Sequence, residues 1–172
     1  RAIVKKVIST ILAIELTVSL NPLSTNNRNV LANTNAYSGT VGENITWDYD
    51  ENTQTLSFDG EGKLDYSSQI SQFSKPIKTI KIGKDINYIS VSNFEDNETI
   101  QQYIVEDGNE VYCTKDGVIY DKNEEKIIKY PSGVDNSQFK VPETVKEIGK
   151  YAFSSSKKLQ NIILNKSINN IE

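Results

Sequence analysis

The first candidate functional residues in this sequence are four side chains that carry oxygen atoms and could bind a metal ion. They are Asp48, Asp50, Asn52 and Asp59, and a calcium loop supplies oxygen ligands at such alternating positions. However, Thr53 stands where the loop needs a turn-forming glycine, and the last acid is an aspartate instead of the longer glutamate. A solvated hairpin turn explains these residues without an ion. We therefore expect no metal site here.

Catalytic groups are scarce. The sequence has no histidine, which excludes Ser-His and Cys-His nucleophile pairs and histidine metal sites. The acids Asp121, Glu124 and Glu125 form a loop cluster, with nothing to give two of them the unlike environments that paired catalytic carboxylates need. Gly60 and Gly62 follow a strand pattern but lack the helix that a phosphate loop requires. We expect no cofactor and no enzymatic activity.

The composition excludes two further classes of site. Cys113 is the sole cysteine, so an intramolecular disulfide and a multi-cysteine zinc site are excluded. Because Cys113 lies in a strand-like run, we expect its side chain to be buried. The formal net charge is -4, and no basic stripe with interleaved aromatic residues is present, so we expect no nucleic-acid partner.

Residues 1–36 have the pattern of an export signal. A basic start precedes an apolar run over residues 7–20, and a polar stretch then ends in small residues near Ala32 and Ala36. A signal peptidase accepts such small residues before its cut. Glu15 interrupts the run, which is also short for a bilayer-spanning helix. The segment predicts a secreted or cell-surface protein with a cleaved signal peptide. The alternative is an uncleaved anchor, the only contact with a membrane that we expect.

Residues 37–74 are expected to form an amino-terminal β-hairpin region. Apolar residues alternate with polar ones over 45–49 and again over 56–58, with a polar break at 50–54. This alternation predicts two strands joined by a turn. A hairpin cannot cover its own apolar face, so it must pack against the segment that follows.

Residues 75–172 contain a repeat. The segments 80–82, 139–141 and 162–164 each hold an apolar-x-apolar pair, with further apolar residues four and seven positions later. The step from residue 139 to residue 162 is 23 residues. A fixed period in the twenties predicts a solenoid, because each unit must bury its apolar side chains against its neighbours. The expected fold is mainly β, with a strand and a short helical turn in each unit.

One unit of this repeat is longer than the others. The step from Val105 to Val141 is 36 residues, and the extra residues predict an inserted β-hairpin near 116–131. A short helical turn is expected near 150–156. The last unit reaches Glu172 without a polar cap, so we expect the array to be truncated at this end.

Part of the repeat resembles a known family. The segment 141–153 reads VPETVKEIGKYAF and is followed by Leu159, a pattern similar to the BspA-like leucine-rich repeats of bacterial surface proteins. Ser156 stands where that family often has a cysteine, and residues 38–47 resemble the hairpin that precedes such repeats. The resemblance implies a module for protein binding or adhesion. Its partner would be an extracellular or host protein, or a cell-surface component. The alternative is a non-catalytic appendage of a larger secreted or cell-wall enzyme.

The partner surface predicted from this pattern is the outward side of the repeat strands. Its candidate residues lie between or beside the inward apolar pairs, and they are Thr79, Lys81, Gln102, Ile104, Lys140, Asn161 and Ile163. Ile104 and Ile163 are apolar where a solvated face would be polar. They contact a partner, lie under the inserted hairpin, or serve only as good strand formers.

Overall fold

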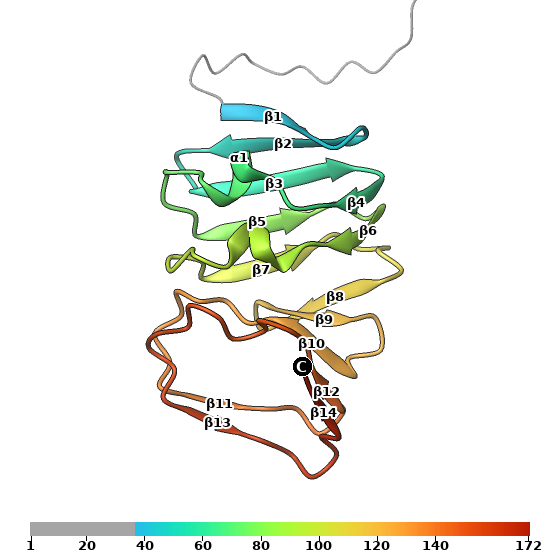
Figure 1. Ribbon diagram of the computed structural model, residues 1–172, viewed down its shortest axis with the longest axis vertical. Helices are drawn as coiled ribbons and strands as arrows, with labels where there is room; N and C mark the ends of the chain where they lie inside the picture. The colour runs from blue at the N-terminus through green and yellow to red at the C-terminus, as the bar shows by residue number, and fades with distance from the viewer. Residues whose placement is uncertain (1–36) are drawn as a thin grey trace, which may run out of the picture. The chain divides into compact units, whose positions relative to one another are not determined.

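The computed structural model describes residues 37–172, and the predicted export signal over residues 1–36 lies outside the described residues. The described chain is mainly β, with fourteen strands, one short α-helix and one short 3-10 helix (Figure 1). Within this part of the chain, no helix is long and apolar enough to cross a membrane. The predicted class, a mainly β solenoid, is confirmed.

The first sheet joins the amino-terminal hairpin to the solenoid. Its strands, in spatial order, are β1 (Tyr37–Val41), β2 (Ile45–Asp50), β3 (Thr55–Gly60), β5 (Thr79–Ile82) and β7 (Gln102–Val105). β1, β2 and β3 pair in antiparallel fashion, whereas β3, β5 and β7 pair in parallel. The parallel ladder therefore begins at β3, inside the segment expected to be a hairpin region. β3 is both a strand of the hairpin and the first strand of the parallel ladder.

Each of the first coils adds a second strand and a helical turn. β4 (Gly62–Leu64) pairs in parallel with β6 (Ile86–Ile89). The short helix α1 (Ser68–Ser71) contacts the 3-10 helix η1 (Val91–Phe94) of the next coil. Each element of one coil thus packs against the equivalent element of the next coil, as a solenoid requires.

A three-stranded meander interrupts the array. β8 (Tyr112–Lys115), β9 (Val118–Asp121) and β10 (Lys126–Lys129) are antiparallel neighbours. β10 then pairs in parallel with β12 (Glu147–Ile148), and β12 pairs with β14 (Asn170–Ile171). The insertion is therefore larger than the hairpin expected near 116–131, because β8 joins it and opens a new sheet.

The parallel stacking resumes after the meander. β11 (Gln138–Lys140) pairs in parallel with β13 (Asn161–Ile163). Gln138 lies opposite Asn161, and Thr79 lies opposite Gln102, so both ladders advance by 23 residues per coil. This confirms the period read from the sequence.

The helical turn expected near 150–156 is wrong. This segment forms successive hydrogen-bonded turns, with Ala152 N–H donating to Gly149 O and Ser154 N–H to Tyr151 O. Tyr151 and Ser155 have φ angles of 59° and 60°, which lie in the left-handed region. A right-handed helix cannot pass through two such residues.

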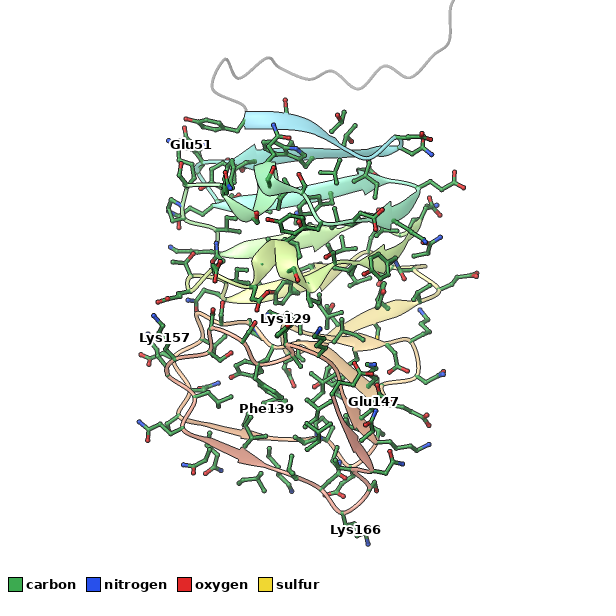
Figure 2. All side chains as sticks on the ribbon, viewed as in Figure 1. Glu51, Lys129, Phe139, Glu147, Lys157 and Lys166 are labelled. Carbon is green, nitrogen blue, oxygen red and sulfur yellow. The ribbon has the colours of Figure 1, made fainter. Side chains whose placement is uncertain are left out.

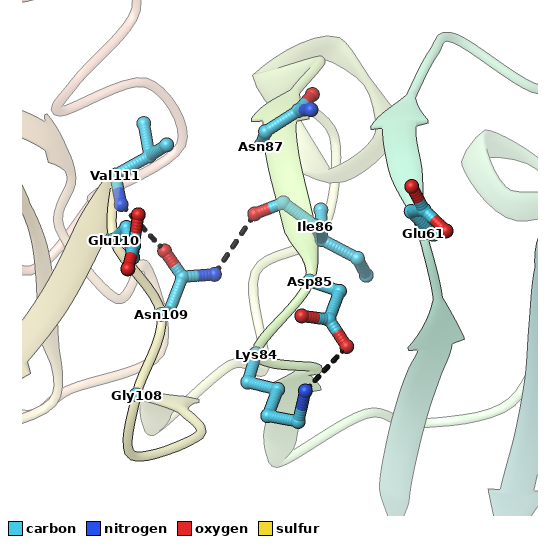
Figure 3. A pocket seen from close by; sticks show the side chains of 9 residues that line it. All are labelled: Glu61, Lys84, Asp85, Ile86, Asn87, Gly108, Asn109, Glu110 and Val111. Atoms are coloured by element: carbon cyan, nitrogen blue, oxygen red, sulfur yellow. Dashed lines mark hydrogen bonds and ion pairs between the residues drawn. The ribbon is translucent and has the colours of Figure 1, made fainter.

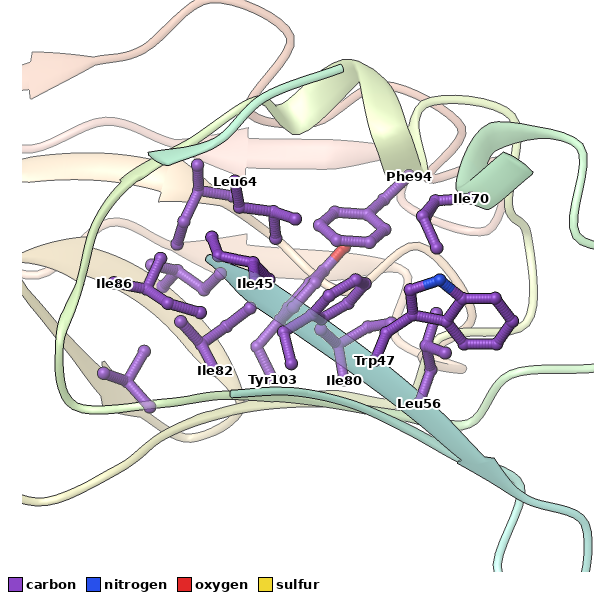
Figure 4. Packing of buried hydrophobic residues seen from close by; sticks show 14 of the residues in the cluster. Ile45, Trp47, Leu56, Leu64, Ile70, Ile80, Ile82, Ile86, Phe94 and Tyr103 are labelled. Carbon is purple, nitrogen blue, oxygen red and sulfur yellow. The ribbon is translucent and has the colours of Figure 1, made fainter. Parts of the chain in front are cut away.

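The inward side chains form two apolar clusters along the described coils. The first extends from the hairpin to Ile119 in the meander and includes Trp47, Phe58, Phe94 and Tyr103 (Figure 4). The second joins Ile127 and other meander residues to the coils that follow. Burying a large apolar side chain contributes about 1.5–3 kcal/mol. The stacked coils therefore provide the burial that no single coil could provide alone.

Cys113 is half-buried instead of fully buried as expected. It lies on β8, which is an edge strand of its sheet, so one side of the residue stays open. Its Sγ donates to Asp121 O at 3.3 Å, and partial burial raises the pKa of the thiol. The residue is therefore a packed thiol with low reactivity.

Lys129 is fully buried where the meander meets the last coils (Figure 2). Its Nζ donates to Tyr151 O at 3.0 Å and to Ser154 O at 3.4 Å. Burial lowers the pKa of Lys129 to about 8, while nearby Glu95 opposes this shift. The ammonium thus links the meander to the turns at 151–154 through hydrogen bonds, at the cost of burying a charge.

Raising the pH from about 8 to about 10 is expected to stabilise the protein relative to a Lys129→Met variant. Between these pH values Lys129 has lost its proton in the folded protein, where its pKa is near 8. In the unfolded chain Lys129 has an ordinary lysine pKa and still holds the proton. The free energy of unfolding should therefore rise with pH, by about 2 kcal/mol in all. Urea unfolding of both proteins at several pH values checks this. Parallel pH profiles would contradict the lowered pKa.

Candidate functional site

The outward side of the first sheet carries one row of side chains that crosses all five strands. The register places opposite one another, in order, Ser38, Asp48, Ser57, Lys81 and Ile104. We call these five residues the ladder row. Their neighbours along each strand point inward, so the core holds the row on a rigid sheet.

Lys81 and Ile104 are directly opposite each other on the last two strands of this sheet. Lys81 is exposed and makes no ion pair with any residue of the range 37–172. Ile104 is 37% exposed, so the meander does not cover it. An unpaired ammonium beside an exposed isoleucine suits a partner that offers both a carboxylate and an apolar group.

The second ladder shows the same pattern. Lys140 on β11 lies opposite Ile163 on β13, and Gln138 lies opposite Asn161. All four side chains are exposed. The predicted candidates are therefore brought together as two groups, Lys81 with Gln102 and Ile104, and Lys140 with Asn161 and Ile163. They do not form one continuous ladder, because the meander separates β7 from β11.

Thr79 lies on the predicted outward side of β5, but it is only 8% exposed. Its register neighbours Thr55 and Gln102 flank it, and Gln102 Nε2 donates to Thr79 Oγ1 at 3.3 Å. A small side chain between two neighbours on a sheet is easily covered.

The acids considered for a calcium loop have other roles. Asp50 caps its hairpin turn, accepting from Thr53 Oγ1 and from Asn52 N–H, each at 2.9 Å. These hydrogen bonds lower the pKa of Asp50. Burial raises the pKa of Asp48, and Asp50 adds to the effect. Between residues 37 and 172, no group of three or more potential ligands is arranged to hold a metal ion.

A polar groove of about 620 Å³ lies between the loops at 84–87 and 108–111, beside Glu61 (Figure 3). Lys84 in this groove is paired with Asp85 at 2.6 Å, and the Asn109 amide is used by backbone groups of both loops. The polar side chains of this groove are thus already engaged in contacts that stabilise the fold. The groove is a weaker candidate than the ladder row, whose lysine is unpaired.

Three members of the ladder row are not evident from the sequence. Ser38, Asp48 and Ser57 belong to the predicted hairpin region, and only the pairing of β3 with β5 places them in line with Lys81. The available signal is the alternation of Thr, Ser and Asp along β2 and β3. That alternation marks an outward side but does not say which strand lies next to it.

A family model and one solved structure both indicate a leucine-rich repeat fold. Residues 130–172 match the family model described as BspA type leucine rich repeat region (6 copies). No curated protein matches the chain. A leucine-rich repeat protein from Eubacterium ventriosum is structurally similar, with a TM-score of 0.54 and 14% identity over 79% of this chain and 62% of that one.

Two other solved structures are more distantly similar. The pneumococcal vaccine antigen PcpA has a TM-score of 0.48 and 24% identity, over 61% of this chain and 28% of its own. A leucine rich cell surface protein from Faecalibacterium prausnitzii has a TM-score of 0.41 and 23% identity, over 57% and 30% of the two chains. This chain thus spans less than two thirds of each of these three proteins.

The family match covers β11, β12, β13 and β14, where the parallel ladder resumes with its period of 23 residues. β3, β5 and β7 show the same kind of parallel stacking before the meander. Residues 130–172 of this chain thus match a BspA-type leucine-rich repeat region both in sequence and in the spacing of their strands.

Proposed function

We propose that this protein is an interaction module of the cell exterior, and that a partner protein docks on the ladder row. The observation that carries the proposal is the exposed and unpaired Lys81 directly opposite the exposed Ile104. Leucine-rich repeats commonly serve protein interaction, which supports a binding scaffold over an enzyme. Fold alone does not specify a partner, so the proposal rests on these side chains.

The row is suited to binding because its backbone is held in place. Its strands lie over buried residues such as Phe58, Ile80 and Tyr103, each no more than 2% exposed. Binding a partner therefore costs little in ordering this surface, and preorganisation of this kind favours affinity. Ile104 also has few side-chain conformations to lose, because it is β-branched.

Secretion or display on the cell surface is the second part of the proposal. It is supported by the basic, apolar and small-residue pattern of residues 1–36. It is also supported by the bacterial surface proteins in which BspA-like repeats occur. Adhesion to a host or neighbouring-cell protein is the form of interaction that we propose.

The Ile104→Arg variant tests the docking surface. Binding of the full chain to immobilised extracellular-matrix proteins and to cell-wall glycan is measured by surface plasmon resonance. We expect binding to a protein, and at least about a tenfold loss in the variant, because a charged side chain replaces a central apolar contact. Val111→Arg is the matched control, since Val111 is also 37% exposed but lies beside the polar groove.

Two results would overturn this proposal. One is binding to glycan alone, with no protein bound. The other is equal loss of binding in the Ile104 and Val111 variants, which would show that the ladder row has no special role. A β-rich circular dichroism spectrum for each variant confirms that the compared proteins are folded.

A further inference from the structure

The two ladders repeat one outward arrangement on either side of the meander. In each, a lysine on one strand lies directly opposite an isoleucine on the next: Lys81 with Ile104, and Lys140 with Ile163. An amide side chain precedes each isoleucine by two residues, Gln102 in the first ladder and Asn161 in the second. We call the two sets the lysine–isoleucine pairs.

Both pairs are accessible, and neither lysine is held in a close ion pair. Ile104 is 37% exposed and Ile163 is 42% exposed. Neither Lys81 nor Lys140 forms an ion pair with another residue of the described coils. By contrast Lys126 forms ion pairs with both Glu147 and Glu172. Lys81 interacts electrostatically with Asp48 and Asp50, but neither lysine is fixed by an ion pair, so each can contact an external carboxylate.

The two lysines occupy equivalent places in their coils. β5 leads into β6 and β11 leads into β12, so each lysine lies on the first strand of its coil. The isoleucine strands differ, because β13 leads into β14 whereas β7 leads into β8, the edge strand of the meander sheet. β5, β7, β11 and β13 are spaced along the long axis of the described coils, with β8–β10 between the two ladders (Figure 1). Two like pairs spaced along this axis can be reached by a single elongated partner.

The neighbours of the first pair indicate the polarity of that partner. Across the ladder row an acid, Asp48, is followed by the hydroxyl of Ser57, the ammonium of Lys81 and the apolar Ile104. A partner carboxylate is attracted to Lys81 and repelled by Asp48, so it lies toward β7. An apolar side chain next to that carboxylate then covers Ile104.

We propose that each lysine–isoleucine pair binds an acidic residue with an adjacent apolar residue, and that both pairs bind one extended polypeptide at two points. This rests on the proposed function, in which the outward side of the strands binds protein. An exposed lysine–carboxylate contact is weak by itself. Linking two such contacts raises the apparent affinity by about 10²–10⁴-fold when the linker spans both sites.

Designed peptides test the inference with the full chain. One peptide carries a single Glu-Leu pair in a Gly/Ser-rich sequence, and a second set carries two such pairs with Gly/Ser linkers of graded length. In surface plasmon resonance we expect the best two-pair peptide to bind at least about tenfold more tightly than the one-pair peptide. Affinity should pass through a maximum as the linker lengthens, because only a matching length spans both pairs.

Charge reversal identifies the residues involved. Lys81→Glu and Lys140→Glu are each expected to reduce binding of the two-pair peptide to about the level of the one-pair peptide. Lys63→Glu is the matched control, because Lys63 is an exposed lysine on β4 with no ion pair in residues 37–172. Lys81→Gln and Lys140→Gln remove the charge more gently if a glutamate variant fails to fold.

The outcomes separate this inference from the proposed function. Equal binding of one-pair and two-pair peptides, or equal effects of the Lys63 and Lys81 variants, would overturn the two-point proposal. If a matrix protein binds and Ile104→Arg abolishes that binding while no Glu-Leu peptide binds, the docking surface stands and the acidic–apolar partner is wrong. If neither protein nor peptide binds, both fail.

Discussion

Asn109→Ala is expected to lower the free energy of unfolding by about 3–4 kcal/mol. The side chain is 1% exposed and joins two coils. Its Nδ2 donates to Gly83 O at 3.1 Å and to Ile86 O at 2.8 Å, and its Oδ1 accepts from Val111 N–H at 2.9 Å and Tyr112 N–H at 2.8 Å. Alanine leaves these buried backbone groups without partners, and each loss carries a desolvation penalty.

The last coil supplies the matched control. Asn165 makes the same four kinds of contact, to Pro142 O, Val145 O, Ser167 N–H and Ile168 N–H, but it is only half-buried. Water can replace its bonds more readily, so we expect Asn165→Ala to cost about 1–2 kcal/mol.

Urea unfolding of the two alanine variants measures the difference. Asn109→Asp adds a further check, since it keeps the accepting oxygen but replaces the two donors to Gly83 and Ile86 by a second acceptor. It should be as harmful as alanine. If Asn165→Ala proves more destabilising than Asn109→Ala, burial does not set the strength of this contact.

Gly60→Ala is the second large effect, with an expected loss of about 3 kcal/mol or more. Gly60 has a φ of 119°, and a Cβ at this position would lie 2.0 Å from Asn44 O. The contact is with backbone in the turn just before β2, so it cannot be relieved by a side-chain rotation. The hairpin must open where β3 passes into the first coil.

Gly62→Ala separates backbone strain from this clash. Gly62 has a φ of 103°, yet a Cβ added at this position would meet no heavy atom within 4 Å. Only the conformational penalty remains, which we expect to be about 1–2 kcal/mol. Thermal unfolding of both variants gives the comparison. Equal losses would show that the left-handed conformation, not the contact with Asn44, determines the need for glycine at position 60.

The apolar columns are the most predictable part of the fold. Spacing alone predicts inward positions for Ile80, Ile82, Ile86 and Val145, and each is at most 1% exposed, whereas the equivalent Ile162 and Leu164 on β13 are 39% and 46% exposed. This follows because burial of an apolar side chain is favourable in any compact arrangement, so spacing alone reveals the inward side. The outward positions of Lys81, Ile104, Lys140 and Ile163 follow from the same alternation.

The turns and the insertion are less predictable. The expected helix near 150–156 depends on local pattern, but Tyr151 and Ser155 adopt positive φ angles in the folded coil. The sequence also places the insertion near 116–131, whereas the new sheet already begins with β8 (Tyr112–Lys115), which pairs with β9. Such choices depend on competition between neighbouring strands, which a single segment does not encode.

By itself the sequence determined the periodic elements of this protein: strands with one apolar side, stacked every 23 residues in the ladders at 79–102 and 138–161. Hydrophobic spacing suffices for that, because it is a local property of the chain. Only the tertiary structure decided which outward residues become neighbours. The register of β3, β5 and β7 aligns Asp48 with Lys81 and Ile104, and the meander divides the candidates into two lysine–isoleucine pairs. Register arises from contacts between segments distant in sequence, so the surface that a partner meets is a property of the folded coils.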